Sequence, residues 1–162
     1  MIERGRPLVL FFSFSLLLSF LLQLVVLPDP IGAARPLWIP LIIAYWALIE
    51  PRVPILLVAF LSGLLCDVLF STALGQHGLG LVLLAYVVSR MRPIFILFPL
   101  WQSTLALAPT WLLYTYLMFW IDAGMHHQAD LWLRWLPVIS TTLFWPLVFV
   151  LMELVRTRED AE

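Results

Sequence analysis

The sequence predicts an all-α integral membrane protein with about six transmembrane helices packed in one bundle. Hydrophobic residues make up 63% of the 162 residues, and the mean hydropathy is +1.01, whereas soluble domains are about 45–50% apolar. Charged residues, 12% of the chain, cluster between apolar runs that are long enough to cross a bilayer. The net charge of -1 and the lack of a basic stripe argue against nucleic-acid binding. The length allows a single polytopic membrane domain over residues 1–162.

The apolar runs define the individual spans. A helix needs about 20 residues to cross the ~30 Å hydrocarbon core of a bilayer. Six runs meet or approach this length, at residues 8–27, 37–49, 53–70, 76–91, 101–121 and 131–152. The second and fourth runs are short for a full crossing. The apolar segment 94–100 is predicted to form either an interfacial helix or the start of the fifth span.

The first run is predicted to stay in the protein as a helix. Its basic start, and the small residues Gly32 and Ala34 that follow it, would also fit a signal peptide. Its apolar core is longer than the ~7–15 residues of most signal peptides, which favours retention. Cleavage would leave the orientation of the other five helices unchanged.

The arginines predict the orientation, because loops on the cytoplasmic side of a membrane carry an excess of basic residues. All nine basic residues are arginine. With the N-terminus in the cytoplasm and six crossings, seven arginines fall inside and two outside. The inside set is Arg4, Arg6, Arg52, Arg90, Arg92, Arg156 and Arg158, and the outside set is Arg35 and Arg134. Both termini are therefore predicted to be cytoplasmic.

One carboxylate, Asp67, lies inside the third apolar run. A charge at the bilayer centre costs several kcal/mol, so such a residue normally faces protein or water. Ala59, Gly63, Asp67 and Ser71 recur every four residues and are predicted to share one helix face. Small residues on such a face allow another helix to approach closely.

Three interpretations of Asp67 follow. It holds the helix bundle together, it lines a polar cavity or grips a partner helix, or it relays protons. The last is weakest, because the spans hold no second acid or base. If Asp67 is a hydrogen-bonded residue between helices, Asn should largely preserve function and Leu should not.

The outer loops hold the other candidate ligands. His126 and His127 lie between Asp122 and Asp130, and together these residues would offer a metal nitrogen and oxygen ligands. Adjacent histidines on a helix cannot both face one ion, so a solvated loop is the favoured interpretation, and His77 is interpreted in the same way. No metal or cofactor is predicted.

An enzyme is not predicted. Ser71, Thr72 and His77 follow Asp67 along the chain, but their spacing matches no nucleophile or metalloprotease motif. The only cysteine, Cys66, cannot form an intramolecular disulfide.

The tryptophans are predicted mostly to anchor the helix ends at the membrane surface, where indole rings prefer to lie. Trp38 and Trp132 lie near outer ends of spans, and Trp46 and Trp101 near inner ends. Trp145 differs, because it lies within the last span.

The order of these landmarks resembles the MreD family of rod shape-determining proteins, over nearly the whole chain. The landmarks are Arg35-Pro36-Leu37-Trp38, Tyr45-Trp46, Gly63 and Asp67 with Ser71, Leu74 and Gly75, and Trp145-Pro146. The resemblance implies a fold similar to the substrate-binding components of vitamin transporters, which have six helices. By position it marks Arg35, Pro36, Gly63, Asp67 and Gly75 as the residues that matter.

The resemblance also implies a function. It is that of a non-enzymatic inner-membrane component of the bacterial cell-wall elongation complex, which maintains rod shape and supports lateral peptidoglycan synthesis. The implied partner is MreC, a bitopic membrane protein, and through it MreB, RodA and the elongation transpeptidase, together with membrane lipids. The alternative is a solute-binding membrane component of a transporter, with Asp67 and aromatic residues lining a pocket.

Overall fold

The computed structural model describes residues 5–28, 31–95, 97–124 and 135–159. Within these ranges the chain forms six α-helices and one short 3-10 helix, with no strand. The elements are α1 (Gly5–Leu24), η1 (Ile31–Ala34), α2 (Trp38–Ile49), α3 (Ile55–Phe70), α4 (Gln76–Phe95), α5 (Leu100–Gly124) and α6 (Leu136–Glu159). The predicted all-helical fold with six main helices is confirmed.

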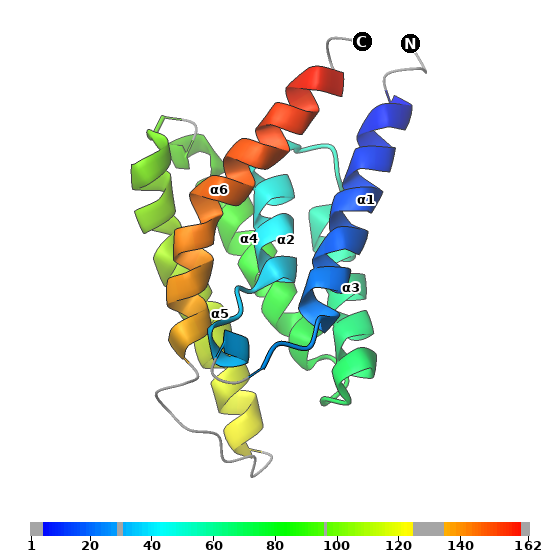
Figure 1. Ribbon diagram of the computed structural model, residues 1–162, viewed down its shortest axis with the longest axis vertical. Helices are drawn as coiled ribbons and strands as arrows, with labels where there is room; N and C mark the ends of the chain where they lie inside the picture. The colour runs from blue at the N-terminus through cyan, green and yellow to red at the C-terminus, as the bar shows by residue number, and fades with distance from the viewer. Residues whose placement is uncertain (1–4, 29–30, 96, 125–134, 160–162) are drawn as a thin grey trace.

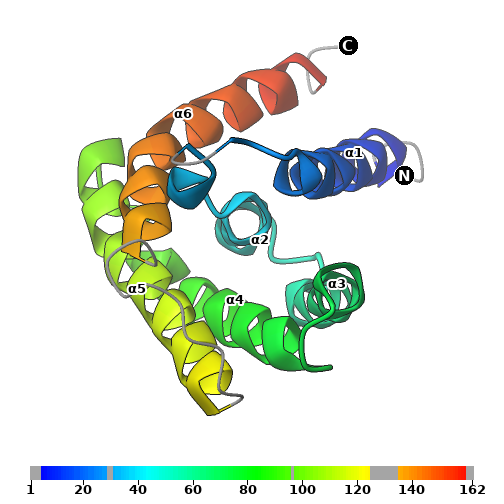
Figure 2. The same ribbon diagram turned by 60° about the horizontal axis from the view of Figure 1, so that its bottom comes forward.

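The helices run alternately up and down, and α2 lies in the middle, packed against α1, α3, α4 and α6 (Figures 1 and 2). The start of α1 and the end of α6 lie at the same end of the bundle (Figure 1). This end is called the terminal end below, and the opposite end is called the distal end. An even number of crossings places both ends of the chain on one side of a membrane.

The central position of α2 follows from its sequence. A helix that is apolar all round can be buried on every face. Residues Ile39–Leu48 are all buried, and the only polar side-chain atoms among them belong to Tyr45 and Trp46. The Trp46 indole N–H donates to the Ser15 hydroxyl of α1 (3.0 Å), and the Tyr45 hydroxyl donates to Glu153 of α6 (3.1 Å). The two polar groups of this buried segment of α2 are thus paired, as an apolar interior requires.

Trp46 was expected at the membrane surface, and that prediction is wrong. The side chain is fully buried, and its ring meets Phe11 and Phe12 of α1 edge to face. The physical reason is that α2 has neighbours on all sides, so the inner end of this helix is covered by protein. Trp101 of α5, by contrast, is 63% exposed and remains available to a membrane surface.

The helices that are short for a crossing are the first and third, whereas the sequence predicted that the second and fourth would be short. Four segments are long and apolar enough to cross a membrane, at Ile31–Ile49, Gln76–Phe95, Leu100–Gly124 and Leu136–Thr157. The apolar helices Leu8–Leu24 and Ile55–Phe70 are shorter. The fourth run is therefore long enough for a full crossing, because its helix continues past Arg90 to Phe95. Residues 131–134 of the predicted last span lie outside the described residues.

Arg92, near the end of α4, is hydrogen-bonded to the end of α2. Its guanidinium donates two hydrogen bonds to the Ala47 carbonyl in the last turn of α2, one of them 3.1 Å long. The last carbonyls of a helix have no partner in their own helix, and a cation there also offsets the partial negative charge of the helix end. Arg92 therefore binds α4 to α2 at the terminal end of the bundle.

Candidate functional site

The connection between α3 and α4 is a tight turn at the distal end. Ser71 follows the last residue of α3 in the left-handed backbone conformation, with φ 54°. Gly75 precedes α4 with φ 93°. Glycine adopts positive φ without the steric cost that a Cβ brings, so its position here follows from the turn. The turn brings the first backbone N–H groups of α4 back toward α3.

The Asp67 carboxylate accepts hydrogen bonds from these N–H groups. Its side chain is in the last turn of α3 and the residue is only 1% exposed. Oδ2 accepts the backbone N–H of Gly75 (2.7 Å), and Oδ1 accepts the backbone N–H of His77 (2.9 Å). Oδ1 also accepts the Thr72 hydroxyl (2.9 Å) and lies 2.8 Å from Nδ1 of His77. We call Asp67, Thr72, Gly75 and His77 the Asp67 clamp.

The clamp caps the start of α4 from another helix. The first four N–H groups of a helix lack partners within it, and a helix start carries a partial positive charge. A side-chain oxygen usually satisfies these groups from the residue just before the helix. Here Asp67 does so from α3, ten residues before His77. The buried carboxylate therefore ties two helices together.

The clamp does not have the geometry of a catalytic triad. Nδ1 of His77 lies 2.8 Å from the Asp67 carboxylate and 3.3 Å from the Thr72 hydroxyl. In a triad the acid and the nucleophile contact different ring nitrogens of the histidine, so that the second nitrogen takes the nucleophile's proton. Here both groups meet the same nitrogen, and Thr72 donates its own proton to Asp67.

Gly63 lies one turn before Asp67 and faces Gly78 of α4. A Cβ at Gly63 would lie 2.3 Å from both Cα and N of Gly78, which no real packing permits. The two backbones are in contact, and only glycine allows this approach. Ala59, one further turn back, is fully buried. The predicted small face is thus a helix–helix seam, filled by α4 of the same chain (Figure 2).

Ser71 was predicted to share this face, and that prediction is wrong. The helix ends at Phe70, and the left-handed residue that follows turns the chain away, so Ser71 is exposed. The periodicity of four residues holds only while the helix lasts.

Arg35 and Pro36 lie at the junction of α1, α2 and α6. The Arg35 guanidinium donates to the carbonyls of Gln23 and Val25 at the end of α1. Pro36 is buried, and the next residue, Leu37, donates its backbone N–H to the Thr141 hydroxyl of α6 (2.9 Å). Arg35 therefore donates hydrogen bonds to carbonyls at the end of α1, as Arg92 does to a carbonyl at the end of α2.

Replacing Arg35 should test this role. Arg35→Ala should lower the midpoint of thermal unfolding, because it removes the charged donors from two helix-end carbonyls. Hydrogen bonds to charged groups contribute about 1.5–3 kcal/mol each. Arg35→Lys should rescue only partly, because an ammonium lacks the planar fork that reaches two carbonyls. The midpoint of thermal unfolding in detergent measures both, with Arg52→Ala, at an exposed position, as the control. Equal midpoints for wild type and Arg35→Ala would contradict the assignment.

Several polar residues at the distal end were not predicted to take part. The interpretation of His77 as a solvated loop residue is wrong, because its ring is bound to the Asp67 carboxylate. Gln76 donates its side-chain amide to Asp122 of α5 (2.7 Å) and so joins α4 to α5. The sequence signal for the contacts of Gln76 and His77 was the turn at Gly75, which places residues 76 and 77 in the first turn of a helix. His126, His127 and Asp130 lie outside the described residues, and no cluster of metal ligands occurs among the described ones.

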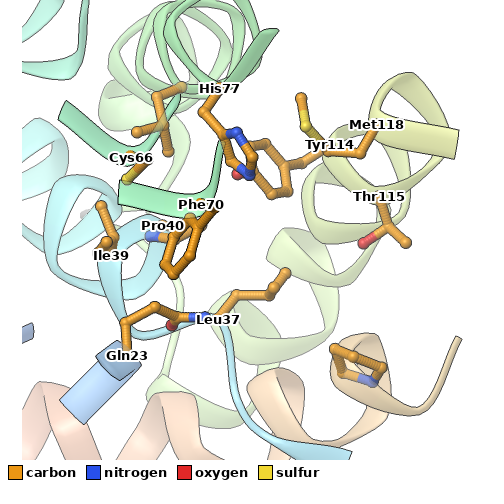
Figure 3. Close-up of a pocket in the computed structure, with 12 residues that line it drawn as sticks. Gln23, Leu37, Ile39, Pro40, Cys66, Phe70, His77, Tyr114, Thr115 and Met118 are labelled. Carbon is orange, nitrogen blue, oxygen red and sulfur yellow. The ribbon is translucent and has the colours of Figure 1, made fainter. Parts of the chain in front are cut away.

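A cavity of about 210 Å³ adjoins the clamp (Figure 3). All six helices or their immediate flanks contribute to its wall, which is mainly apolar. Four side chains with nitrogen or oxygen atoms line it, Gln23 from α1, His77 from α4, and Tyr114 and Thr115 from α5. Apolar pockets with a few convergent polar groups are typical small-molecule sites.

The fold and the clamp define a class of protein. It is a multi-pass α-helical membrane protein in which a deeply buried carboxylate joins two of the helices. The family model described as rod shape-determining protein MreD matches residues 4–155. The chain belongs to this family.

A curated relative agrees with the family match. The rod shape-determining protein MreD of Haemophilus influenzae is 28% identical over 141 residues, which are 87% of this chain and 87% of the relative. No solved structure matches the chain. The expected likeness to the substrate-binding components of vitamin transporters therefore stays a prediction.

Proposed function

We propose that this protein is a non-enzymatic component of the bacterial cell-wall elongation complex, where it maintains rod shape and supports lateral peptidoglycan synthesis. The observation that carries this proposal is the family match, which spans residues 4–155. The proposed direct partner is an MreC-like bitopic membrane protein. Contact with MreB, RodA and the elongation transpeptidase is proposed to be indirect, through that partner.

The proposed location is the bacterial inner membrane, with both termini in the cytoplasm. The seven-to-two distribution of arginines supports this orientation. The arrangement of the helices agrees with it, because α1 begins and α6 ends at the same end of the bundle (Figure 1). Arg35 lies at the opposite end of α1 from its start, as an outer residue should.

The clamp supports a structural role for Asp67. Its two oxygens already accept four hydrogen bonds from within the chain. A carboxylate with this many partners is not poised to exchange a proton with a substrate. The Asp67 carboxylate thus serves the fold, in keeping with a protein that acts by binding others.

The partner must use a face other than the Gly63 seam. That seam is filled by Gly78 and its neighbours in α4, so a charge placed on it would break the hairpin before it reached a partner. Charging the Gly63 face would therefore disturb the packing of α3 on α4 and would not report specifically on a partner interface. The outer faces of the helices carry many exposed apolar side chains and are open to a partner helix or to lipid.

Depletion of the protein from a rod-shaped host tests the proposal. Cells should round up as lateral wall synthesis fails, and a plasmid copy of the wild-type gene should restore rods. The MreC-like protein should co-purify with the wild-type protein at a fixed ratio, whereas an unrelated bitopic membrane protein should not. Rods that keep their shape after depletion would contradict the proposal.

A solute-binding membrane component is the second candidate function. The cavity of about 210 Å³ beside the clamp is the observation that favours it. Unchanged rods together with a small molecule recovered from the purified protein would support this alternative.

A further inference from the structure

The Thr115 hydroxyl is the starting point. Thr115 lies in the middle of α5 and is only 7% exposed, and its hydroxyl oxygen has no hydrogen-bond partner. A buried hydroxyl without a partner costs free energy, so native proteins rarely leave one. Figure 3 shows this oxygen directed into the cavity. An apolar lining that includes an unsatisfied hydroxyl indicates an occupant that completes the hydrogen bond.

His77 offers a second polar group with a defined role. Its Nδ1 is 2.8 Å from the Asp67 carboxylate, which can only accept, so Nδ1 carries the proton. In the neutral ring the other nitrogen, Nε2, is then an acceptor. The ring lines the cavity, and Nε2 has no protein donor among the described residues. The clamp thus presents an acceptor of fixed orientation to the occupant.

The size and walls of the cavity limit that occupant. An engineered apolar cavity of about 150 Å³ holds one benzene molecule, so about 210 Å³ suits a body slightly larger than one ring. Phe70, Tyr114 and Met118 supply aromatic and thioether surface to its wall. Such surfaces favour a flat, polarisable ring over a charged group.

We propose that this cavity binds a small, uncharged ring compound that donates a hydrogen bond to Nε2 of His77 and bonds to the Thr115 hydroxyl. This site would make the protein responsive to a small molecule, independently of the partner binding proposed above. The cavity adjoins the end of α3, the start of α4 and the middle of α5, so an occupant would stabilise the packing of these three helices.

Cys66 provides a direct measurement. It lines the cavity and is the only cysteine in the sequence, so a thiol reagent reports on this site alone. Purified full-length protein is treated with methyl methanethiosulfonate with and without indole, and the modified fraction is followed by mass spectrometry. Indole has a bicyclic body and one N–H donor, and indene has the same shape without the donor.

Indole should slow the modification of Cys66, by about tenfold when its concentration is about nine times its dissociation constant. Indene should require about fivefold more ligand for the same protection, because it lacks one hydrogen bond. Thr115→Val removes the hydroxyl with little change of shape. It should weaken the binding of benzimidazole, which has the shape and the N–H donor of indole and adds a nitrogen acceptor for this hydroxyl, by about fivefold and leave indole binding unchanged. Thr104→Val is the matched control, since the Thr104 hydroxyl bonds to the Leu100 carbonyl of its own helix.

Several results would overturn the proposal. One is an unchanged modification rate with indole, and another is equal protection by indole and indene. A third is equal weakening of benzimidazole binding by Thr115→Val and Thr104→Val. If Cys66 does not react because it is buried, the thermal midpoint decides instead: benzimidazole should raise that of wild type more than that of Thr115→Val. Equal midpoints with and without benzimidazole would also overturn the proposal.

Discussion

Asp67→Leu should lower the free energy of unfolding by about 3–5 kcal/mol, because it leaves several hydrogen-bond donors without an acceptor at a cost of about 1–3 kcal/mol for each buried one. The change leaves the backbone N–H groups of Gly75 and His77 without acceptors in a buried turn. It also frees the His77 ring and removes the negative charge that faces the start of α4. The midpoint of thermal unfolding in detergent, followed by circular dichroism, measures the loss.

Asp67→Asn should be intermediate, with a loss of about 1–3 kcal/mol. The amide oxygen can replace one carboxylate oxygen, but the amide NH₂ then faces a donor, because both oxygens of Asp67 accept hydrogen bonds. This differs from the expectation based on sequence alone, that Asn would largely serve in place of Asp.

Val68→Leu is the control for this series. Val68 is the next residue in the same helix and is 67% exposed, so its replacement should be near neutral. An Asp67→Leu protein that unfolds at the wild-type temperature would show that the clamp does not hold α3 to α4. Equal stability of the Asn variant and wild type would show that the second oxygen is not needed.

Gly63→Ala should have the second large effect, at least about 1–3 kcal/mol, the range measured for overpacked cores. The added Cβ would lie 2.3 Å from the backbone of Gly78, and backbone atoms cannot move aside as a side-chain tip can. The two helices must therefore separate, and the neighbouring clamp would be stretched. The thermal midpoint and the fraction of monodisperse protein after heating measure the effect.

Gly78→Ala is the matched control, since it adds the same methyl group to the same helix pair. Its Cβ would meet the Phe60 ring at 3.4 Å, an ordinary contact. Alanine also favours a helix over glycine by about 1 kcal/mol, so this variant should be as stable as wild type or more so. Equal losses for the two alanine variants would contradict the assigned close approach.

The sequence predicted that Gly63 and Asp67 share a helix face that meets another helix. It did not predict that α4 is this helix, because a face of small residues accepts any close neighbour. It also missed Thr72 and His77 as partners of Asp67. Their contact depends on the turn between Ser71 and Gly75, and the left-handed conformation of Ser71 was not predictable because residues other than glycine, asparagine and aspartate rarely adopt it.

Trp46 shows the same limit in another form. It was assigned to a membrane surface by its position along a span. The structure places Trp46 inside the bundle. A side chain's environment depends on what packs around its helix, and no single span contains this information.

By itself the sequence determined the class of protein, the presence of six helical segments and the expected orientation. These follow from local properties, namely the length of apolar runs against the thickness of a bilayer and the distribution of arginines. Only the tertiary structure decided that α2 is central, that Asp67 caps α4 and that a cavity lies beside this clamp. The reason is that helices in lipid are apolar on the faces that meet lipid and on those that meet protein alike, so hydropathy does not distinguish them.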